Sequence, residues 1–260
     1  NSGDYDSSGD LVGYWRNNNF TSAGLWDDLS DTGVDGTMTG FDGGDYALLP
    51  QGTTAGKDIL GFPLTHVNNG WLHTNDGNTV EIQDNDSLDF GTGSFSVELW
   101  TKSDEASISN GYLVYKYSSN GWAVWADNTS QFKLRLYPVG ITEIHPYVAS
   151  SGVNDVGVWH HWVVIVDKSS QTCKIYKDSV RQTVVNPDIS TITTVDTTNK
   201  LYIGRAGVDG NPFNGSIDEV RIYNRVLTAY EADGSEPEAG EADVSGEILK
   251  NYNHGKSKHS

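Results

Sequence analysis

The chain offers few groups of side chains whose types and spacing could carry out catalysis. Retaining glycoside hydrolysis needs two carboxylates about 5–5.5 Å apart, and the nearest candidates are the neighbours Asp218 and Glu219. Adjacent residues of a strand point to opposite faces, so this pair cannot flank one sugar bond. The sequence also lacks a Gly-x-Ser-x-Gly nucleophile elbow, a His-Glu-x-x-His zinc motif and a phosphate-binding glycine loop. We therefore expect that the chain is not an enzyme.

Two groups of residues suggest metal binding, and neither has the required pattern. His160 and His161 are neighbours in a strand-like run and point to opposite faces, so they cannot chelate one ion together. The spacing of Asp84, Asp86 and Asp89 resembles a calcium loop, but the glycine and the final glutamate of an EF-hand are missing. These aspartates therefore favour a hydrogen-bonded Asx turn.

Charge and composition exclude several classes of partner. The chain has 35 acidic and 17 basic residues, and its formal net charge of −18 repels phosphate backbones, so we expect no nucleic-acid binding. No apolar stretch approaches the length of a membrane span, so we expect no membrane insertion. The single cysteine, Cys173, excludes an intramolecular disulfide, which favours a bacterial or phage source over an animal extracellular one.

Apolar side chains recur every second residue along most of the chain, which is typical of β-strands. The clearest strand spans residues 158–167, and both of its faces carry apolar side chains, as in an inner strand of a sandwich. Turn sequences rich in asparagine, aspartate and glycine separate such strands. The sequence predicts an all-β fold, an antiparallel two-sheet β-sandwich of the jelly-roll kind with a short C-terminal helix.

The pattern divides the chain into one large domain with irregular additions. Residues 1–10 are polar and are expected to form a flexible lead, and residues 11–228 form the sandwich. Residues 229–244 are an inserted acidic loop, which we expect to be disordered because it has no apolar face to bury. Residues 245–260 complete the domain with a short helix, whose N-cap is Ser245, and a basic tail.

Six sequence blocks, in this order, carry a family resemblance. They are residues 11–15 (LVGYW), 26–30 (WDDLS), 85–100 (NDSLDFGTGSFSVELW), 158–161 (VWHH), 201–205 (LYIGR) and 213–228 (FNGSIDEVRIYNRVLT). Together they resemble laminin-G-like, concanavalin A-like lectin/glucanase jelly-roll domains. The C-terminal run is similar to copies of this domain in phage structural proteins.

The resemblance implies a candidate calcium site. In this family an Asp-x-Ser turn near the first strand often ligates calcium together with an aspartate of the last block. Val34 stands where the family usually has an asparagine, so other oxygens would have to complete the coordination. The alternative is a hydrogen-bonded turn without Ca²⁺. The candidate ligands are Asp28, Ser30, Asp31, Asp35 and Asp218.

The resemblance also leaves open what the domain binds. Glucanases of the superfamily usually carry a Glu-x-Asp-x-Glu strand, which is absent here, so a glycoside hydrolase is the less favoured alternative to a non-catalytic binding or adhesion module. A lectin-like module would hold a glycan or cell-surface polysaccharide on exposed aromatic rings. The alternative is a virion structural or decoration protein that contacts capsid or tail proteins. Both imply an extracellular or virion-surface location. The aromatic candidates are Trp71, Trp122, Trp125, Tyr137 and Tyr147.

Overall fold

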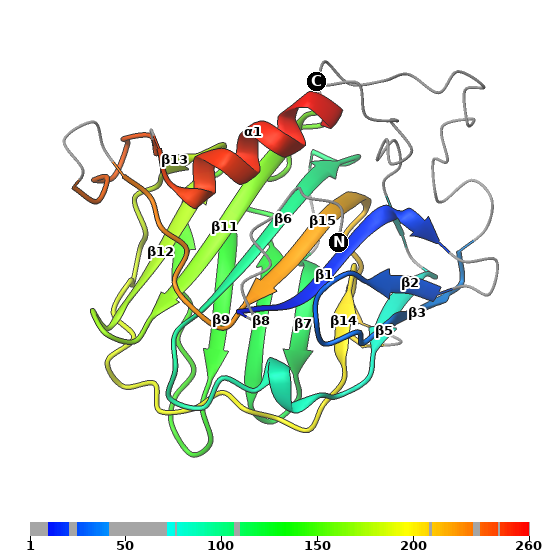
Figure 1. The fold of residues 1–260 in the computed structure, drawn as a ribbon, viewed down its shortest axis with the longest axis horizontal. Helices are drawn as coiled ribbons and strands as arrows, with labels where there is room; N and C mark the ends of the chain where they lie inside the picture. The colour runs from blue at the N-terminus through cyan, green and yellow to red at the C-terminus, as the bar shows by residue number, and fades with distance from the viewer. Residues whose placement is uncertain are drawn as a thin grey trace.

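The computed structural model describes residues 10–20, 25–41, 72–75, 77–106, 110–207, 210–230, 235–243 and 245–259. Within these ranges the chain forms a sheet of 15 strands, a single short 3-10 helix and one α-helix (Figure 1). All pairings between the named strands are antiparallel, which confirms the predicted fold class.

The strands form one continuous hydrogen-bonded sheet that folds over on itself into two layers (Figure 1). In ladder order, the first layer contains β10 (Tyr147–Val148), β9 (Phe132–Tyr137), β8 (Gly121–Ala126), β7 (Gly111–Tyr117), β14 (Leu201–Ile203) and β5 (Thr79–Ile82). The connection runs through β3 (Gly36–Thr39) and β2 (Leu25–Asp28). The second layer contains β1 (Leu11–Phe20), β15 (Gly215–Tyr223), β6 (Phe95–Ser103), β11 (Trp159–Asp167), β12 (Thr172–Lys177) and β13 (Val180–Arg181), with β4 (Leu72–Thr74) beside β15.

Aromatic rings from the two layers meet in the core. Phe132 of β9 stacks on Trp162 of β11 with ring centroids 4.1 Å apart, and Phe95 of β6 lies 5.4 Å from Trp122 of β8. These rings and the aliphatic side chains around them are almost completely buried. Since large aromatic side chains bury much apolar area, the contacts between layers hold the sandwich together.

Helix α1 (Glu247–His259) lies across the outer face of the second layer (Figure 1). The ring of Tyr252 stacks on Trp100 of β6, with centroids 5.7 Å apart. Gly255 allows the close approach, because a Cβ at this position would lie 2.2 Å from Trp100 Nε1. Among the described residues, no helix is long and apolar enough to cross a membrane.

The start and length of α1 differ from the sequence-based expectation. The helix begins at Glu247 and continues to His259, so it includes most of the run that was expected to be a basic tail. The carboxylate of Asp243, rather than the predicted N-cap Ser245, accepts hydrogen bonds from the backbone N–H groups of Gly246 (2.6 Å) and Leu249 (2.7 Å). Contacts of the helix with β6 and β11 stabilise turns that the sequence alone does not favour.

The described part of the acidic segment, residues 235–243, has partners that its composition did not suggest. The backbone N–H of Arg181 in β13 donates to Glu241 O (2.8 Å), and Gly240 N donates to Arg181 O (2.7 Å). Glu236 forms an ion pair with Lys174 Nζ at 2.6 Å. Residues 235–243 thus lie along an edge strand, which differs from the expected disordered loop. Residues 1–9, which include nearly all of the expected flexible lead, lie outside the described residues.

Strand β15 contains a bulge that simple alternation did not predict. Its register against β6 shifts between Asp218 and Arg221, and Glu219 has a φ of 54°. Asp218 Oδ2 lies 3.5 Å from Nε2 of His259 in α1, and Glu219 accepts a hydrogen bond from the Tyr14 hydroxyl at 2.7 Å. Both carboxylates therefore lie on the α1 side of the sheet, and the prediction that they point to opposite faces is wrong.

Candidate functional site

The outer face of the first layer carries a group of aromatic and basic side chains. In β9, Phe132, Leu134 and Leu136 point into the core, and the residues between them point outward and are partly exposed. The neighbouring strands contribute further outward-pointing aromatic side chains, some of which form a small apolar cluster separate from the core. We call this surface the tyrosine face, and it comprises Tyr112, Tyr115, Tyr117, Trp125, Lys133, Arg135, Tyr137, Tyr147 and Tyr202.

Local strand geometry explains which residues reach the tyrosine face. Trp122 and Trp125 are three residues apart in β8, so they point to opposite sides of the sheet. In β7 the register against β8 shifts between Tyr112 and Val114. This bulge places Leu113 and Val114 together in the core and leaves the tyrosines of β7 on the outer side.

The rings of the tyrosine face pack against one another. Tyr112 is stacked beside Trp125 of the next strand, with centroids 5.6 Å apart and planes 17° apart. Tyr115 meets Tyr112 edge to face at 5.0 Å and lies 6.4 Å from Tyr202 of β14. Because each ring is held by its neighbours, the surface is organised before any ligand binds, which lowers the entropic cost of binding.

Lys133 and Arg135 lie over these rings. Lys133 Nζ is 4.8 Å from the centroid of the Trp125 ring and 5.5 Å from that of Tyr147, and it pairs with Asp127 at 2.6 Å. The guanidinium of Arg135 is 5.0 Å from the centroid of Tyr117 and 5.7 Å from that of Trp125. Cations in such positions are attracted by the ring quadrupole and restrict the motion of the rings.

Arg135 is also hydrogen-bonded within the face. Its Nη1 donates to the hydroxyl oxygen of Tyr112 at 3.3 Å, and its Nε lies 3.4 Å from Glu143 Oε2. His145 accepts a hydrogen bond from Arg135 Nε at 3.3 Å, and burial lowers the pKa of this histidine despite the nearby Glu143. Burial likewise raises the pKa of Tyr115, so this phenol is neutral and can donate a hydrogen bond at neutral pH.

The structure brings together three of the five aromatic candidates from the sequence. Trp125, Tyr137 and Tyr147 all lie on the tyrosine face, where Tyr137 and Tyr147 are partly exposed and Trp125 is 8% exposed. Trp122 is only 1% exposed and packs in the core, so it cannot contact a ligand from the surface. Trp71 lies outside the described residues. The alternation in residues 132–137 could have identified Lys133 and Arg135 as outward-pointing residues. The residues of the face that the sequence analysis did not name are Tyr112, Tyr115, Tyr117, Tyr202, Lys133 and Arg135.

The candidate calcium turn is filled by hydrogen bonds. Asp28 is 8% exposed, and its two carboxylate oxygens accept five hydrogen bonds. Asp35 Oδ1 in turn accepts from the Asp28 backbone N–H at 2.9 Å. The five donors to Asp28 are Tyr14 N (2.9 Å), Ser30 N (2.9 Å), Ser30 Oγ (2.8 Å), Thr32 Oγ1 (2.8 Å) and Val34 N (2.9 Å).

This arrangement does not fit a calcium site, because Ca²⁺ needs six to eight oxygen ligands and the Asp28 oxygens already accept five hydrogen bonds. Asp31 is exposed, and Asp218 lies instead beside His259. In the described ranges no group of three or more histidine, cysteine, aspartate or glutamate side chains is placed to hold a metal. The geometry favours the hydrogen-bonded turn, and calcium binding at these residues stays a prediction.

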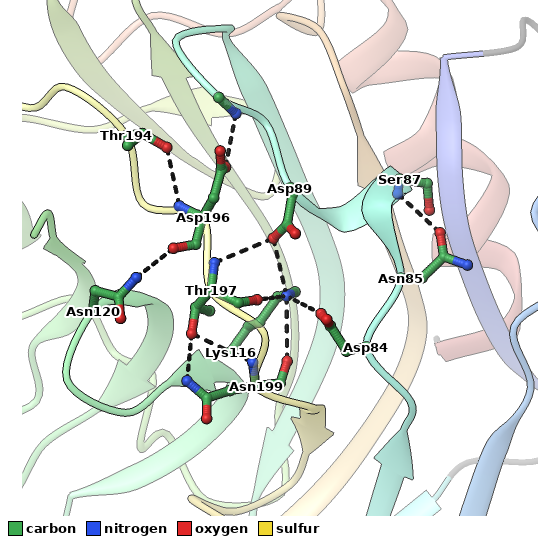
Figure 2. Close-up of polar contacts among 11 residues, drawn as sticks. Asp84, Asn85, Ser87, Asp89, Lys116, Asn120, Thr194, Asp196, Thr197 and Asn199 are labelled. Carbon is green, nitrogen blue, oxygen red and sulfur yellow. Dashed lines mark hydrogen bonds and ion pairs between the residues drawn. The ribbon is translucent and has the colours of Figure 1, made fainter.

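Two aspartates of the calcium-like spacing bind an internal ammonium group (Figure 2). Lys116 of β7 is completely buried, and its Nζ lies 2.7 Å from Asp84 Oδ1 and 3.1 Å from Asp89 Oδ1. It also donates to the carbonyl oxygens of Thr197 (2.6 Å) and Asn199 (3.2 Å). Lys116 therefore joins two loops to the first layer at the end of β7.

The third aspartate of that spacing belongs to the expected turn. Residues Asp86–Leu88 form a 3-10 helix, and the side chain of Asn85 accepts a hydrogen bond from Ser87 N at 2.9 Å (Figure 2). An asparagine side chain that accepts from the backbone two residues on defines an Asx turn. The turn is thus formed by Asn85, rather than by the aspartates from which it was expected.

A second ionic cluster lies beneath α1. Arg221 Nη1 is 3.2 Å from Glu98 Oε1, and Arg221 Nη2 pairs with Glu219. His161 Nε2 lies 2.7 Å from Glu98 Oε1. Burial alone would raise the pKa of Glu98, but Arg221 and His161 hold it below its ordinary value. All four side chains are buried, so the cluster is part of the helix–sheet contact.

Comparison with protein families agrees with this architecture. A family model described as the concanavalin A-like lectin/glucanases superfamily matches residues 74–232, which is more than half of the chain. A search of curated protein sequences finds no match.

Solved structures with a similar fold include binding domains of toxins. The binding domain of Paraclostridial Mosquitocidal Protein 1 has a TM-score of 0.62 and 15% identity, over 86% of this chain and 51% of that one. The binding domain of botulinum neurotoxin DC in complex with rat synaptotagmin II has a TM-score of 0.63 and 12% identity, over 94% and 51%. The same toxin's domain in complex with SialylT has a TM-score of 0.60 and 12% identity, over 84% and 49%. The chain spans about half the length of these structures.

Proposed function

Because the chain belongs to the concanavalin A-like lectin/glucanase superfamily, we propose that it is a non-catalytic binding module that holds a glycan on its tyrosine face. The observation that carries the proposal is the preorganised set of rings, of which Tyr115, Tyr137 and Tyr202 are partly exposed, with paired charges beside them. Sugars need both kinds of contact, since their C–H faces pack against aromatic rings and their hydroxyls need polar partners.

The charges of the tyrosine face and its edge favour a neutral glycan. The basic side chains there are each paired with a carboxylate, so the surface is close to neutral within a chain of net charge −18. An acidic glycan would be repelled by the whole chain and would have to displace a carboxylate from its partner. The pairs are Lys133–Asp127 (2.6 Å), Arg135–Glu143 (3.4 Å) and Lys200–Glu81 (2.5 Å).

The placement of the carboxylates supports binding without cleavage. Glu98 and Glu219 share the guanidinium of Arg221, but both are completely buried beneath the side of the sheet that α1 covers. On the tyrosine face, Glu143 and Asp127 are each engaged with a cation. A glycosidase acid has to reach the glycosidic oxygen of a bound sugar, which the buried pair cannot do.

The location and a second candidate partner are also part of the proposal. We propose an extracellular or virion-surface site of action, because that is where a module of this kind meets glycans. Similar folds have been solved with SialylT and with rat synaptotagmin II, so the architecture serves both kinds of ligand in those proteins. Tyrosine, tryptophan and arginine are also enriched in protein interfaces, which keeps a capsid or tail protein as the second candidate.

A glycan array that contains neutral and acidic glycans tests the proposal. We expect retention of neutral glycans and a roughly tenfold loss of affinity in Tyr115→Ala and Tyr137→Ala, since each removes a stacking contact. Tyr230→Ala is the matched control, because Tyr230 is exposed and lies outside the tyrosine face. Equal binding by all variants, or binding only to a virion protein, would refute the glycan site. Thermal melts establish that each variant folds.

A further inference from the structure

His145 lies at the edge of the tyrosine face and shares its polar contacts. It belongs to the segment between β9 and β10, which is held to the sheet by two backbone hydrogen bonds of 3.0 Å between Leu136 and Ile144. The ring of His145 meets that of Trp125 edge to face, with centroids 6.2 Å apart, and its side chain is 31% exposed. The backbone thus fixes this histidine against the face, while its ring can still exchange protons with the solvent.

The hydrogen bonds around His145 show which of its nitrogens carries a proton. Arg135 Nε donates to His145 Nε2 at 3.3 Å. Because a guanidinium can only donate, Nε2 is the acceptor nitrogen and the ring is neutral. Glu143 Oε2 lies 3.4 Å from Arg135 Nε and also 3.4 Å from His145 Nε2. One carboxylate oxygen is therefore equally far from the cation that it pairs with and from the nitrogen that can take up a proton.

Proton uptake by His145 is incompatible with this arrangement. A protonated imidazole donates from both nitrogens, so two N–H groups would face each other across the 3.3 Å between Arg135 Nε and His145 Nε2. Burial and the charges of Arg135 and Lys133 in β9 hold the pKa of His145 below its ordinary value of 6.5, although Glu143 acts in the opposite direction. The ring therefore takes up its proton in weakly acidic solution, where Glu143 becomes its only nearby acceptor among these groups.

Arg135 connects this change to the aromatic rings. Its guanidinium lies 5.0 Å from the centroid of Tyr117 and 5.7 Å from that of Trp125, and its Nη1 donates to the Tyr112 hydroxyl at 3.3 Å. Burial raises the pKa of Tyr112, so this hydroxyl stays uncharged in acid. A displacement of Arg135 thus removes a cation from two rings and a hydrogen-bond donor from a third.

We infer that proton uptake by His145 transfers Glu143 from Arg135 to His145 and loosens the tyrosine face, so that glycans bind less tightly in weakly acidic solution. The exchange of partners stands on the distances around His145 alone. Its effect on binding rests on the proposed glycan-binding function.

NMR of the ligand-free chain, labelled with fluorotyrosine and ¹⁵N-histidine, tests the exchange of partners between pH 8 and pH 4.5. The Tyr117 signal should shift with the same midpoint as the His145 ring, and this midpoint should lie below 6.5. The signal of the exposed Tyr230 should not follow it. Glu143→Gln should lower the midpoint further, because the Glu143 carboxylate favours the protonated ring. Loss of packing alone would not move the midpoint in that direction.

Two histidine variants separate His145 from the other titrating groups. His145→Gln keeps an acceptor oxygen but cannot take up a proton, so the shift of Tyr117 should disappear. His73→Gln is the matched control, because His73 of β4 is also 31% exposed and lies 2.6 Å from a carboxylate oxygen, that of Asp104. In this control the shift should remain. The inference is overturned if Tyr117 keeps its position while His145 titrates, or if the shift survives in His145→Gln.

The array of neutral and acidic glycans tests the effect on binding, at pH 7 and at one pH unit below the NMR midpoint. The retained neutral glycans should bind roughly three- to tenfold less tightly at the lower pH, the effect of about one lost hydrogen bond, and His145→Gln should show no such difference. Equal affinity of the unaltered chain at both pH values would overturn the control of binding and leave the glycan site standing. An array that is negative at both pH values would refute the glycan site and its control together, while the NMR shifts would still decide the exchange of partners.

Discussion

The buried ammonium of Lys116 provides the sharpest test of how the loops are held. Lys116→Met keeps the apolar stem and removes the charge, so the carboxylates of Asp84 and Asp89 and the carbonyls of Thr197 and Asn199 lose their shared donor. Removing one partner of a buried ion pair costs about 3–5 kcal/mol. Asp84 and Asp89 are 30% and 24% exposed and regain some water, whereas the two carbonyls add a cost of about 1–3 kcal/mol each.

The regained hydration of the two carboxylates and the cost of the two unpaired carbonyls act in opposite directions and offset each other. We therefore expect the free energy of unfolding to fall by about 3–5 kcal/mol. For a chain of this size a loss of 1 kcal/mol lowers Tm by about 2 °C, so Lys116→Met should melt about 6–10 °C lower in calorimetry. Lys200→Met is the matched control, because the same substitution there affects an ammonium that is 42% exposed and pairs only with Glu81. Its Tm should be nearly unchanged.

A third variant isolates the electrostatic part of the effect. In Asp84→Asn/Lys116→Met one of the two uncompensated carboxylates is also removed, so part of the lost Tm should return. The reasoning would be refuted by a drop in Lys116→Met no larger than that of the Lys200→Met control. It would also be refuted if Asp84→Asn/Lys116→Met melted at a lower temperature than Lys116→Met, because the two substitutions would then act independently.

Three further predictions concern acidity, helix docking and calcium. Arg221 holds the pKa of Glu98 below 4.5 against the effect of burial. This carboxylate therefore adds stability above pH 4.5, and that stability is lost as pH falls through the lower pKa of the folded state. Glu98→Gln should melt at a lower temperature than the unaltered chain at pH 7, and its Tm should decline less steeply towards pH 3. Gly255→Ala places a Cβ against Trp100, so the free energy of unfolding should fall by about 1–3 kcal/mol and limited proteolysis should cleave α1 sooner than in the unaltered chain. Because the Asp28 oxygens are filled by hydrogen bonds, calcium and EDTA should give the same Tm, and a rise in Tm with calcium would show that the turn opens to bind the ion.

The sequence predicts the sandwich well because its dominant signal is local. Alternation in residues 132–137 places Leu134 in the core and Arg135 outside, as the structure has them. The same rule applied to Trp122 and Trp125 would have separated them, since three residues along a strand reverse the direction of a side chain. The sequence alone thus indicates that Trp125 and Trp122 point to opposite sides of the sheet.

Other features depend on residues that are far apart in the chain. The carboxylates that pair with Lys116 precede it by 32 and 27 residues, and the carbonyls follow it by 81 and 83, so no local pattern identifies a buried lysine here. The bulge at Glu219 reverses the expected direction of Asp218, and a bulge leaves little trace in sequence. Helix α1 extends through Gly255 because tertiary contact with Trp100 outweighs the low helix propensity of glycine.

NMR of the chain labelled with fluorotyrosine tests the glycan-binding face most directly. In a titration with the oligosaccharide that binds most tightly, the signals of Tyr115, Tyr137 and Tyr202 should shift together along one binding curve. The signals of Tyr176, which packs in the second-layer cluster, and of the exposed Tyr230 should stay in place. Shifts at Tyr230 or Tyr176 without shifts on the tyrosine face would contradict the account, because the glycan would then bind elsewhere.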